Sequence, residues 1–207
     1  MRYCLNLSRI GLLEYRDLLK AQNLLPGRRM LLDDIDRNFA ALLALGIETL
    51  EQLRQRLATP PKLAALSAAS GISEGYLKLL KRESGSFEQA PVPLASFPGQ
   101  DAALLASLRQ DDSINSRDYF ERGADQTGEL YHLCDLVRIN GVGALAAKAF
   151  YDAGFTSVQE VANAEAADML RRVTRVNAEQ QCYKANLGEK DMRFCIDFAR
   201  LFMRYSD

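Results

Sequence analysis

The chain of 207 residues has almost no excess charge of either sign. It contains 26 basic and 27 acidic residues, which gives a formal net charge of −1 at pH 7. Basic and acidic residues number 7 and 5 in residues 1–40, 9 and 11 in 41–128, and 10 and 11 in 129–207. A protein that binds nucleic acid tightly through phosphates usually carries a clear basic excess. This balance is the main argument against such a function.

Metal-binding and nucleophilic motifs are missing too. The four cysteines are scattered without CxxC spacing, which favours buried thiols in a reducing compartment. His132 is the only histidine, and it stands two residues from Cys134 on one predicted helix, so the two side chains point apart. Asp33, Asp34 and Asp36 precede a predicted helix, where capping and the helix dipole explain them. The sequence therefore indicates no cofactor, no metal site and no enzyme.

Long apolar runs are also lacking. No run approaches the roughly 20 apolar residues that span a bilayer. Residues 1–6 have neither an apolar core nor a small-residue cleavage site, so we see no signal peptide. Apolar residues nevertheless make up 48% of the chain, which is too many for a disordered protein. We expect a folded, cytoplasmic protein that makes no membrane contact.

What the sequence does contain is helical periodicity. Apolar residues recur with helical spacing in almost every periodic stretch, and strand alternation is not convincing anywhere. Serine, glycine and three prolines then interrupt this pattern in residues 84–99, and proline disfavours helix at its own and the preceding position. We therefore predict an all-α fold with a helical half at 1–83, a linker at 84–96 and a second half at 97–207. The second half is expected to end in a docking helix.

One short pattern occurs twice. Residues 45–53 and 153–161 each contain a glycine, an apolar residue and then a hydroxyl residue. The hydroxyl residues, Thr49 and Ser157, stand three positions before a Gln or Glu, which fits a helix capping box. A weaker third copy covers residues 113–120. Short helical units that repeat in this way bury their apolar faces on one another.

The stretch from Ile139 to Gly143 (Ile-Asn-Gly-Val-Gly) is the most informative part of the chain. Two glycines separated by one aliphatic residue predict a turn too tight for residues with a Cβ, and Val142 is expected to plug the core. The helix that follows begins with unpaired main-chain N–H groups, which together with its dipole favour an anion such as a phosphate. The pattern predicts a helix-hairpin-helix, which most often holds the nucleic-acid backbone.

These residues resemble a bacterial family catalogued as a domain of unknown function and built from tandem helix-hairpin-helix repeats. The run from Asp135 to Gly143 fits the family's typical Asp-Leu-x-Arg-Ile-x-Gly-Val-Gly, and residues 153–158 fit the segment after it. Residues 40–53 and 63–80 resemble its first half. The resemblance implies SAM-like helix-hairpin-helix repeats. The family has no settled activity, and its relatives by fold include nucleic-acid-binding units of repair enzymes and polymerases.

The candidate site combines the hairpin with basic side chains near it. Its members are Gly141, Val142, Gly143, Lys148, Arg138, Arg171, Arg172 and Arg175. Phosphate-binding members of the wider superfamily usually carry Lys or Arg two residues past the second glycine. Here that position is Leu145, and Lys148 makes up for it only in part. A further basic group, Lys78, Lys81 and Arg82, fits one helix face, for which a solvated surface is the alternative.

Two functions of different classes follow. The leading hypothesis is a non-enzymatic module that binds nucleic acid, DNA above all, through its phosphates and without reading bases. The alternative is a protein-interaction scaffold that uses the same hairpin repeats for packing. The near-zero charge and Leu145 on the hairpin favour this alternative.

Overall fold

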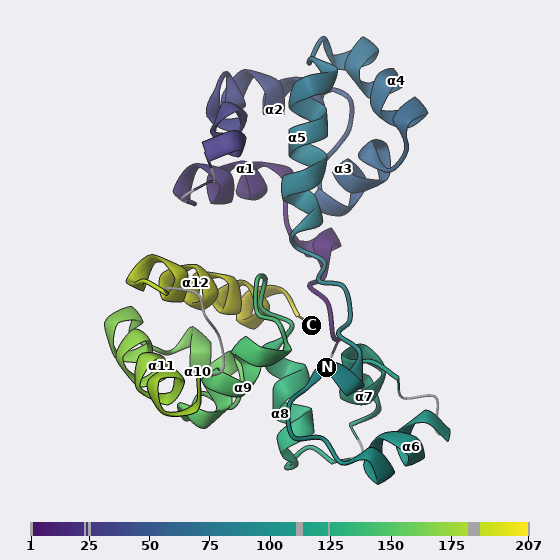
Figure 1. Cartoon of the computed structure of the whole chain (residues 1–207). Helices are drawn as coiled ribbons and strands as arrows, with labels where there is room; N and C mark the ends of the chain where they lie inside the picture. The colour runs from purple at the N-terminus through teal and green to yellow at the C-terminus, as the bar shows by residue number, and fades with distance from the viewer. Residues whose placement is uncertain are drawn as a thin grey trace. The chain divides into compact units, whose positions relative to one another are not determined.

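The computed structural model describes residues 2–22, 24, 26–110, 114–123, 125–181 and 187–206. In this part of the chain every regular element is a helix, which confirms the all-α class, and β-structure is limited to two isolated bridges (Figure 1). The chain divides into two compact units. One is Asn6–Glu88, and the other combines Met1–Leu5 with Gln89–Asp207.

The Asn6–Glu88 unit is built from short helices that begin at polar caps. Thr49, Thr59 and Ser73 each accept a hydrogen bond from the main-chain amide three residues later, which satisfies one of the free N–H groups at a helix start. The rings of Phe39 and Phe87 pack on the fully buried Tyr15 ring. The elements are η1 (Leu7–Arg9), α1 (Leu12–Ala21), η2 (Pro26–Leu32), α2 (Ile35–Ala44), α3 (Leu50–Leu57), α4 (Pro60–Ser70) and α5 (Glu74–Gly85).

The last helix of the second unit packs on the two helices before it. The elements are η3 (Leu94–Ser96), α6 (Ala102–Gln110), α7 (Ser116–Arg122), α8 (Glu129–Leu136), α9 (Ala144–Asp152), α10 (Val158–Ala162), α11 (Ala166–Gln180) and α12 (Glu189–Tyr205). Helix α12 packs against α10 and α11, as Figure 1 shows, through a face that includes Met192, Ile196 and Phe202. The C-terminal segment expected to dock is α12, and its apolar face is buried.

The two copies of the short sequence pattern have the same backbone conformation. Gly46 and Gly154 have positive φ angles of 74° and 82°. The next residues, Ile47 and Phe155, donate their amides to carbonyls five positions earlier, at 3.3 and 2.9 Å, and both side chains are buried. Glycine is required at this turn because only it takes positive φ without steric cost.

The two β-bridges also share one pattern. They pair Gly11 with Thr49 and Pro93 with Asn115. At the first bridge, the Leu12 amide donates to Glu48 O at 2.7 Å and the Leu50 amide donates to Ile10 O at 2.9 Å. At the second, the Leu94 amide donates to Ile114 O at 3.1 Å and the Ser116 amide donates to Val92 O at 2.8 Å. Asn115 also caps α7, so the start of α7 is held in the same way as the start of α3.

The first residues do not belong with the N-terminal half, contrary to the expected division. Tyr3 is buried in the second unit, where its hydroxyl lies 2.6 Å from Ser116 Oγ and its ring packs edge-on against Phe120. Burial raises the pKa of Tyr3 to about 12. The segment expected as a linker is structured at both ends, because α5 continues to Gly85 and residues 92–94 pair with residues 114–116.

Candidate functional site

The turn between α8 and α9 depends on one glycine rather than two. Gly141 has a φ of 83°, and the amide of Val142 donates to Ile139 O at 3.0 Å while its side chain is buried, as predicted. Gly143 has a φ of −89°, and a Cβ there would meet nothing within 4 Å. The prediction that the turn excludes a Cβ at both glycines is therefore wrong for Gly143.

Helix α9 begins without a side-chain cap. Its N-cap is Gly143, and the first bond into the helix joins the Ala147 amide to Gly143 O at 2.9 Å. Within the described residues, no protein acceptor binds the amides of Ala144, Leu145 or Ala146. Gly143 and Leu145 are exposed and Ala144 and Ala146 are half-buried, and these free N–H groups lie at the positive end of the helix dipole.

Most other helices differ from α9 in this respect. Side chains of the N-cap residues accept main-chain amides at the starts of α3, α4, α5, α7, α10 and α11. Sequence reasoning identified two of these caps, Thr49 and Ser157, and both are present. Helices α1, α2 and α8 also begin without a side-chain cap, so α9 shares its open start with several helices of the described chain.

Arg138 lies in the core and not on the surface of the hairpin. Its side chain is 2% exposed and forms an ion pair with Asp135. The guanidinium also donates to the main-chain carbonyls of Tyr3 and Arg2, each at 3.0 Å. The prediction that Arg138 contacts phosphate is wrong, because its donors are directed to acceptors inside the protein.

The surroundings of Arg138 explain why the fold retains it. Its guanidinium carbon lies 4.4 Å from the ring centre of Phe120 and 4.5 Å from that of Phe202, so it is placed between two aromatic faces. The second carboxylate oxygen of Asp135 accepts the amide of Val158, the first residue of α10, at 2.7 Å. The Asp135–Arg138 pair thereby connects the N-terminal segment, α7, α10 and α12.

Lys148 is partly neutralised by acidic neighbours. Its ammonium pairs with Asp152 and lies 3.5 Å from Glu129. Burial lowers the pKa of Lys148, but the hydrogen bond to Asp152 and the charge of Glu129 outweigh this and hold the pKa above its usual value. The side chain stays charged, yet two carboxylates compete with any phosphate for it.

One of the three arginines on α11, Arg172, lies at the far end of α9 from the hairpin. Arg171 pairs with Asp168, and Arg175 is exposed. Arg172 lies 4.2 Å above the Phe155 ring and against Gly154, just beyond the C-terminal end of α9. A nine-residue helix is roughly 13 Å long, so Arg172 stands a full helix length from the amides at the start of α9.

Residues 103–200 match the model of a family described as a domain of unknown function (DUF4332). The matched region contains the hairpin and the Asp135–Arg138 pair, so this part of the chain is similar to a domain-of-unknown-function family, as its motif predicts. No curated protein and no solved structure matches the chain.

Apolar side chains, not basic ones, lie next to the hairpin in the matched region. Leu145 is 50% exposed and Phe194 is 41% exposed. A ring carbon of Phe194 lies 3.9 Å from the position that a Cβ on Gly141 would occupy. Sequence reasoning did not select Phe194, because the apolar pattern of α12 points to its buried face.

Groups for metal chemistry do not gather in the residues that the structure describes, where no three His, Cys, Asp or Glu side chains are placed to hold an ion. His132 lies among aromatic rings, 6.2 Å from the ring centre of Tyr131 and 5.8 Å from that of Tyr151. None of the described helices has the length and apolar character to cross a membrane.

Proposed function

We propose that this chain is a non-enzymatic, non-sequence-specific nucleic-acid-binding module that holds the backbone, above all that of DNA, with tandem helix-hairpin-helix repeats. The observation that carries the proposal is the open start of α9, whose amides at residues 144–146 have no protein acceptor within the described residues. Free N–H groups at the positive end of a helix form an anion site that accepts a phosphate.

The repeated turns support the helix-hairpin-helix assignment. Gly46 and Gly154 occupy equivalent turns, and both are followed by a buried apolar residue and a capped helix. After each turn the short helix packs on other helices of its unit, α3 on α4 and α5, and α10 on α12. We also propose that the protein is located in the reducing cytoplasm, which agrees with the free thiols of Cys4, Cys134 and Cys195.

The hairpin holds the backbone mainly with main-chain amides, because its nearby basic side chains are occupied. Arg138 is buried and Lys148 is paired with two carboxylates. Each neutralised phosphate contributes about 0.9 to the slope of log affinity against log salt. Few basic side chains at the hairpin therefore predict weak binding there, in the range of non-specific complexes.

A pair of substitutions at Gly143 tests this proposal. Its φ of −89° and the open space around it admit both alanine and glutamate, so the two variants differ mainly in charge. We expect Gly143→Glu to weaken the binding of a fluorescent 30-base-pair duplex and Gly143→Ala to leave it unchanged, measured by anisotropy at 50 and 200 mM salt. Equal binding by the two variants, or no salt-sensitive binding by the intact chain, would remove the proposal.

A second candidate, a protein-interaction scaffold, is favoured by the exposed Leu145 and Phe194 beside the hairpin. Large exposed apolar side chains are typical of protein contact surfaces when they form a contiguous patch. Leu145→Lys, added to the same experiment, separates the two candidates. It strengthens duplex binding if the hairpin meets phosphates. It leaves duplex binding unchanged and weakens an association seen by size-exclusion chromatography if the hairpin meets protein.

A further inference from the structure

The near-zero net charge conceals a strongly basic segment. Residues 54–82 contain one acidic residue, Glu74, and six basic residues: Arg54, Arg56, Lys62, Lys78, Lys81 and Arg82. Residues 1–53 contain 7 of each sign, and residues 83–207 contain 13 basic and 19 acidic residues. Residues 54–82 therefore carry a net charge of +5, whereas residues 1–53 are neutral and residues 83–207 carry −6.

The basic segment forms three helices that pack on one another. It covers the end of α3, all of α4 and most of α5, and each of these helices contacts the other two. Arg54 is engaged, since it pairs with Glu88 at 2.7 Å and donates to Ser84 O at 3.2 Å. Lys62 and Arg82 are exposed, and neither has an ion pair or hydrogen bond from its side chain within the described residues.

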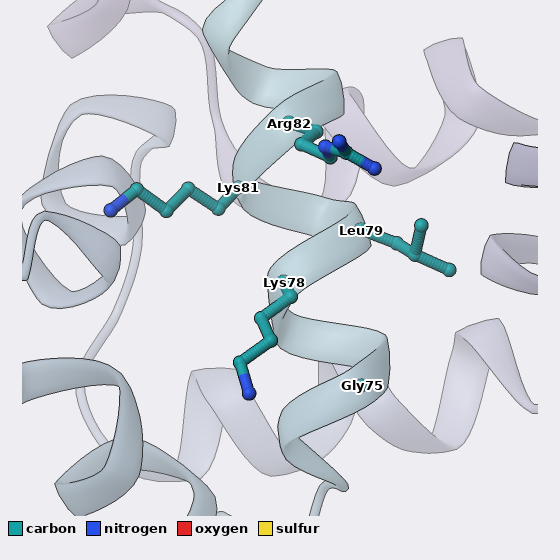
Figure 2. Close-up of a pocket in the computed structure, with 5 residues that line it drawn as sticks. All are labelled: Gly75, Lys78, Leu79, Lys81 and Arg82. Atoms are coloured by element: carbon teal, nitrogen blue, oxygen red, sulfur yellow. The ribbon is translucent and has the colours of Figure 1, made fainter. Parts of the chain in front are cut away.

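Helix α5 presents an open hollow lined by three basic side chains, of which Lys78 pairs with Glu74 at 3.0 Å and Arg82 has no partner within the described residues. The hollow has a volume of about 410 Å³ and is lined by Gly75, Lys78, Leu79, Lys81 and Arg82. Figure 2 shows Lys81 extending to one side of the helix, Leu79 and Arg82 extending to the other, and Lys78 lying nearer the start of α5. Gly75, about one turn before Lys78, has no side chain, so the part of the hollow that it lines is not filled.

The start of α4 adds unbalanced positive charge. Its first turn holds no acidic residue and carries Lys62, although acidic residues are the favourable ones at this end of a helix. Lys81 Nζ donates to Ala58 O at 2.6 Å, and because Ala58 is the C-cap of α3, this cation stabilises the negative end of α3. Lys62 is the unfavourable charge at the positive end of α4, and a bound anion relieves its repulsion with the helix dipole.

We propose that the face formed by α4 and the outer side of α5, with Lys62, Lys78, Lys81 and Arg82, binds the phosphodiester backbone of nucleic acid. This surface shares its ligand class with the function proposed above but uses other residues in the other unit. It lies wholly within Asn6–Glu88.

The composition of this face favours nucleic acid over a protein partner. Protein contact surfaces have an apolar core rich in large side chains. None of the large exposed hydrophobic side chains of the described residues falls between positions 54 and 82. The exposed residues of α4 include several alanines, which let a ligand backbone approach Lys62 closely.

The double variant Lys62→Gln/Arg82→Gln tests the assignment in the full-length chain. Both side chains are exposed and have no partner within the described residues, so their replacement leaves the packing intact. The matched control, Arg29→Gln/Arg37→Gln, removes the same charge from exposed positions of the same unit outside the basic segment. The probe is the same 30-base-pair duplex, titrated between 50 and 200 mM salt.

We expect the double variant to lose affinity for the duplex at 50 mM salt. We also expect the slope of log affinity against log salt to fall by about two, so that the loss of affinity between 50 and 200 mM salt becomes about tenfold smaller. The control is expected to bind like the unmodified chain. An unchanged salt slope in the double variant would overturn the assignment, and so would an equal loss of affinity in the control. The assignment would also fail if the unmodified chain bound poly-glutamate as tightly as it binds the duplex. If the double variant loses duplex affinity while Gly143→Glu binds normally, only the hairpin proposal is removed. If Gly143→Glu loses duplex affinity while the double variant binds normally, only the α4–α5 proposal is removed.

Discussion

Replacement of Arg138 gives the sharpest test of the structural account, because the sequence and the structure predict opposite results. Methionine has a similar length but no charge and no donors, so Arg138→Met removes the ion pair with Asp135 and leaves most of the apolar contact. If Arg138 were a surface residue that binds phosphate, its replacement would change the free energy of unfolding by at most about 0.5 kcal/mol. The replacement of a buried, paired arginine costs much more.

The expected loss follows from the contacts of the buried guanidinium. Removal of one partner of a buried ion pair costs about 3–5 kcal/mol, because the remaining carboxylate of Asp135 stays buried without its counter-charge. The carbonyls of Tyr3 and Arg2 lose donors at 3.0 Å as well. These effects share one network and do not add in full. We expect a loss of about 3–5 kcal/mol, a large part of the total stability of a small domain.

Amide hydrogen exchange read by mass spectrometry measures this loss separately in each unit. Peptides from residues 129–139 and 196–205 are expected to exchange faster in Arg138→Met, whereas peptides from 35–44 in the other unit keep their protection. Arg175→Met, at an exposed position of α11, is the control and should match the unmodified chain. If Arg138→Met and Arg175→Met show equal protection in the second unit, the buried network described here is wrong.

Two further predictions concern the turn and the thiols. Gly141→Ala is expected to lower the free energy of unfolding by about 1–2 kcal/mol because of its φ of 83°, whereas Gly143→Ala has little effect; equal values from urea unfolding would contradict this. Burial raises the pKa of Cys195 to about 12 and raises that of Cys134 further. Unfolded thiols lose their protons near pH 8.5, so stability measured by thermal unfolding should fall between about pH 9 and pH 12. A flat profile over that range would show that these thiols are not buried.

Local features were predictable from the sequence because their causes are local. The hydroxyl caps at Thr49 and Ser157 and the positive φ of Gly46 and Gly154 depend on neighbours within a few residues. The conformation of Gly143 was not predictable in this way, since the turn needs positive φ only at the first of its two glycines.

Features that depend on distant contacts were not predictable. Arg138 is buried because residues 2 and 3 supply carbonyls more than 130 positions away in the chain. Nothing in the pattern of a five-residue N-terminal segment indicates that it packs in the second unit. The basic face is a similar case: Lys78, Lys81 and Arg82 stand out in the sequence, but Lys62 joins them only because α4 packs against α5.

The most direct test of the central claim is a ¹H–¹⁵N NMR titration of the intact chain with a short DNA duplex. The account predicts that the amide signals of residues 143–146 shift in proportion to bound duplex and return when salt is raised. If these signals stay in place while the duplex binds, the start of α9 does not hold the nucleic-acid backbone.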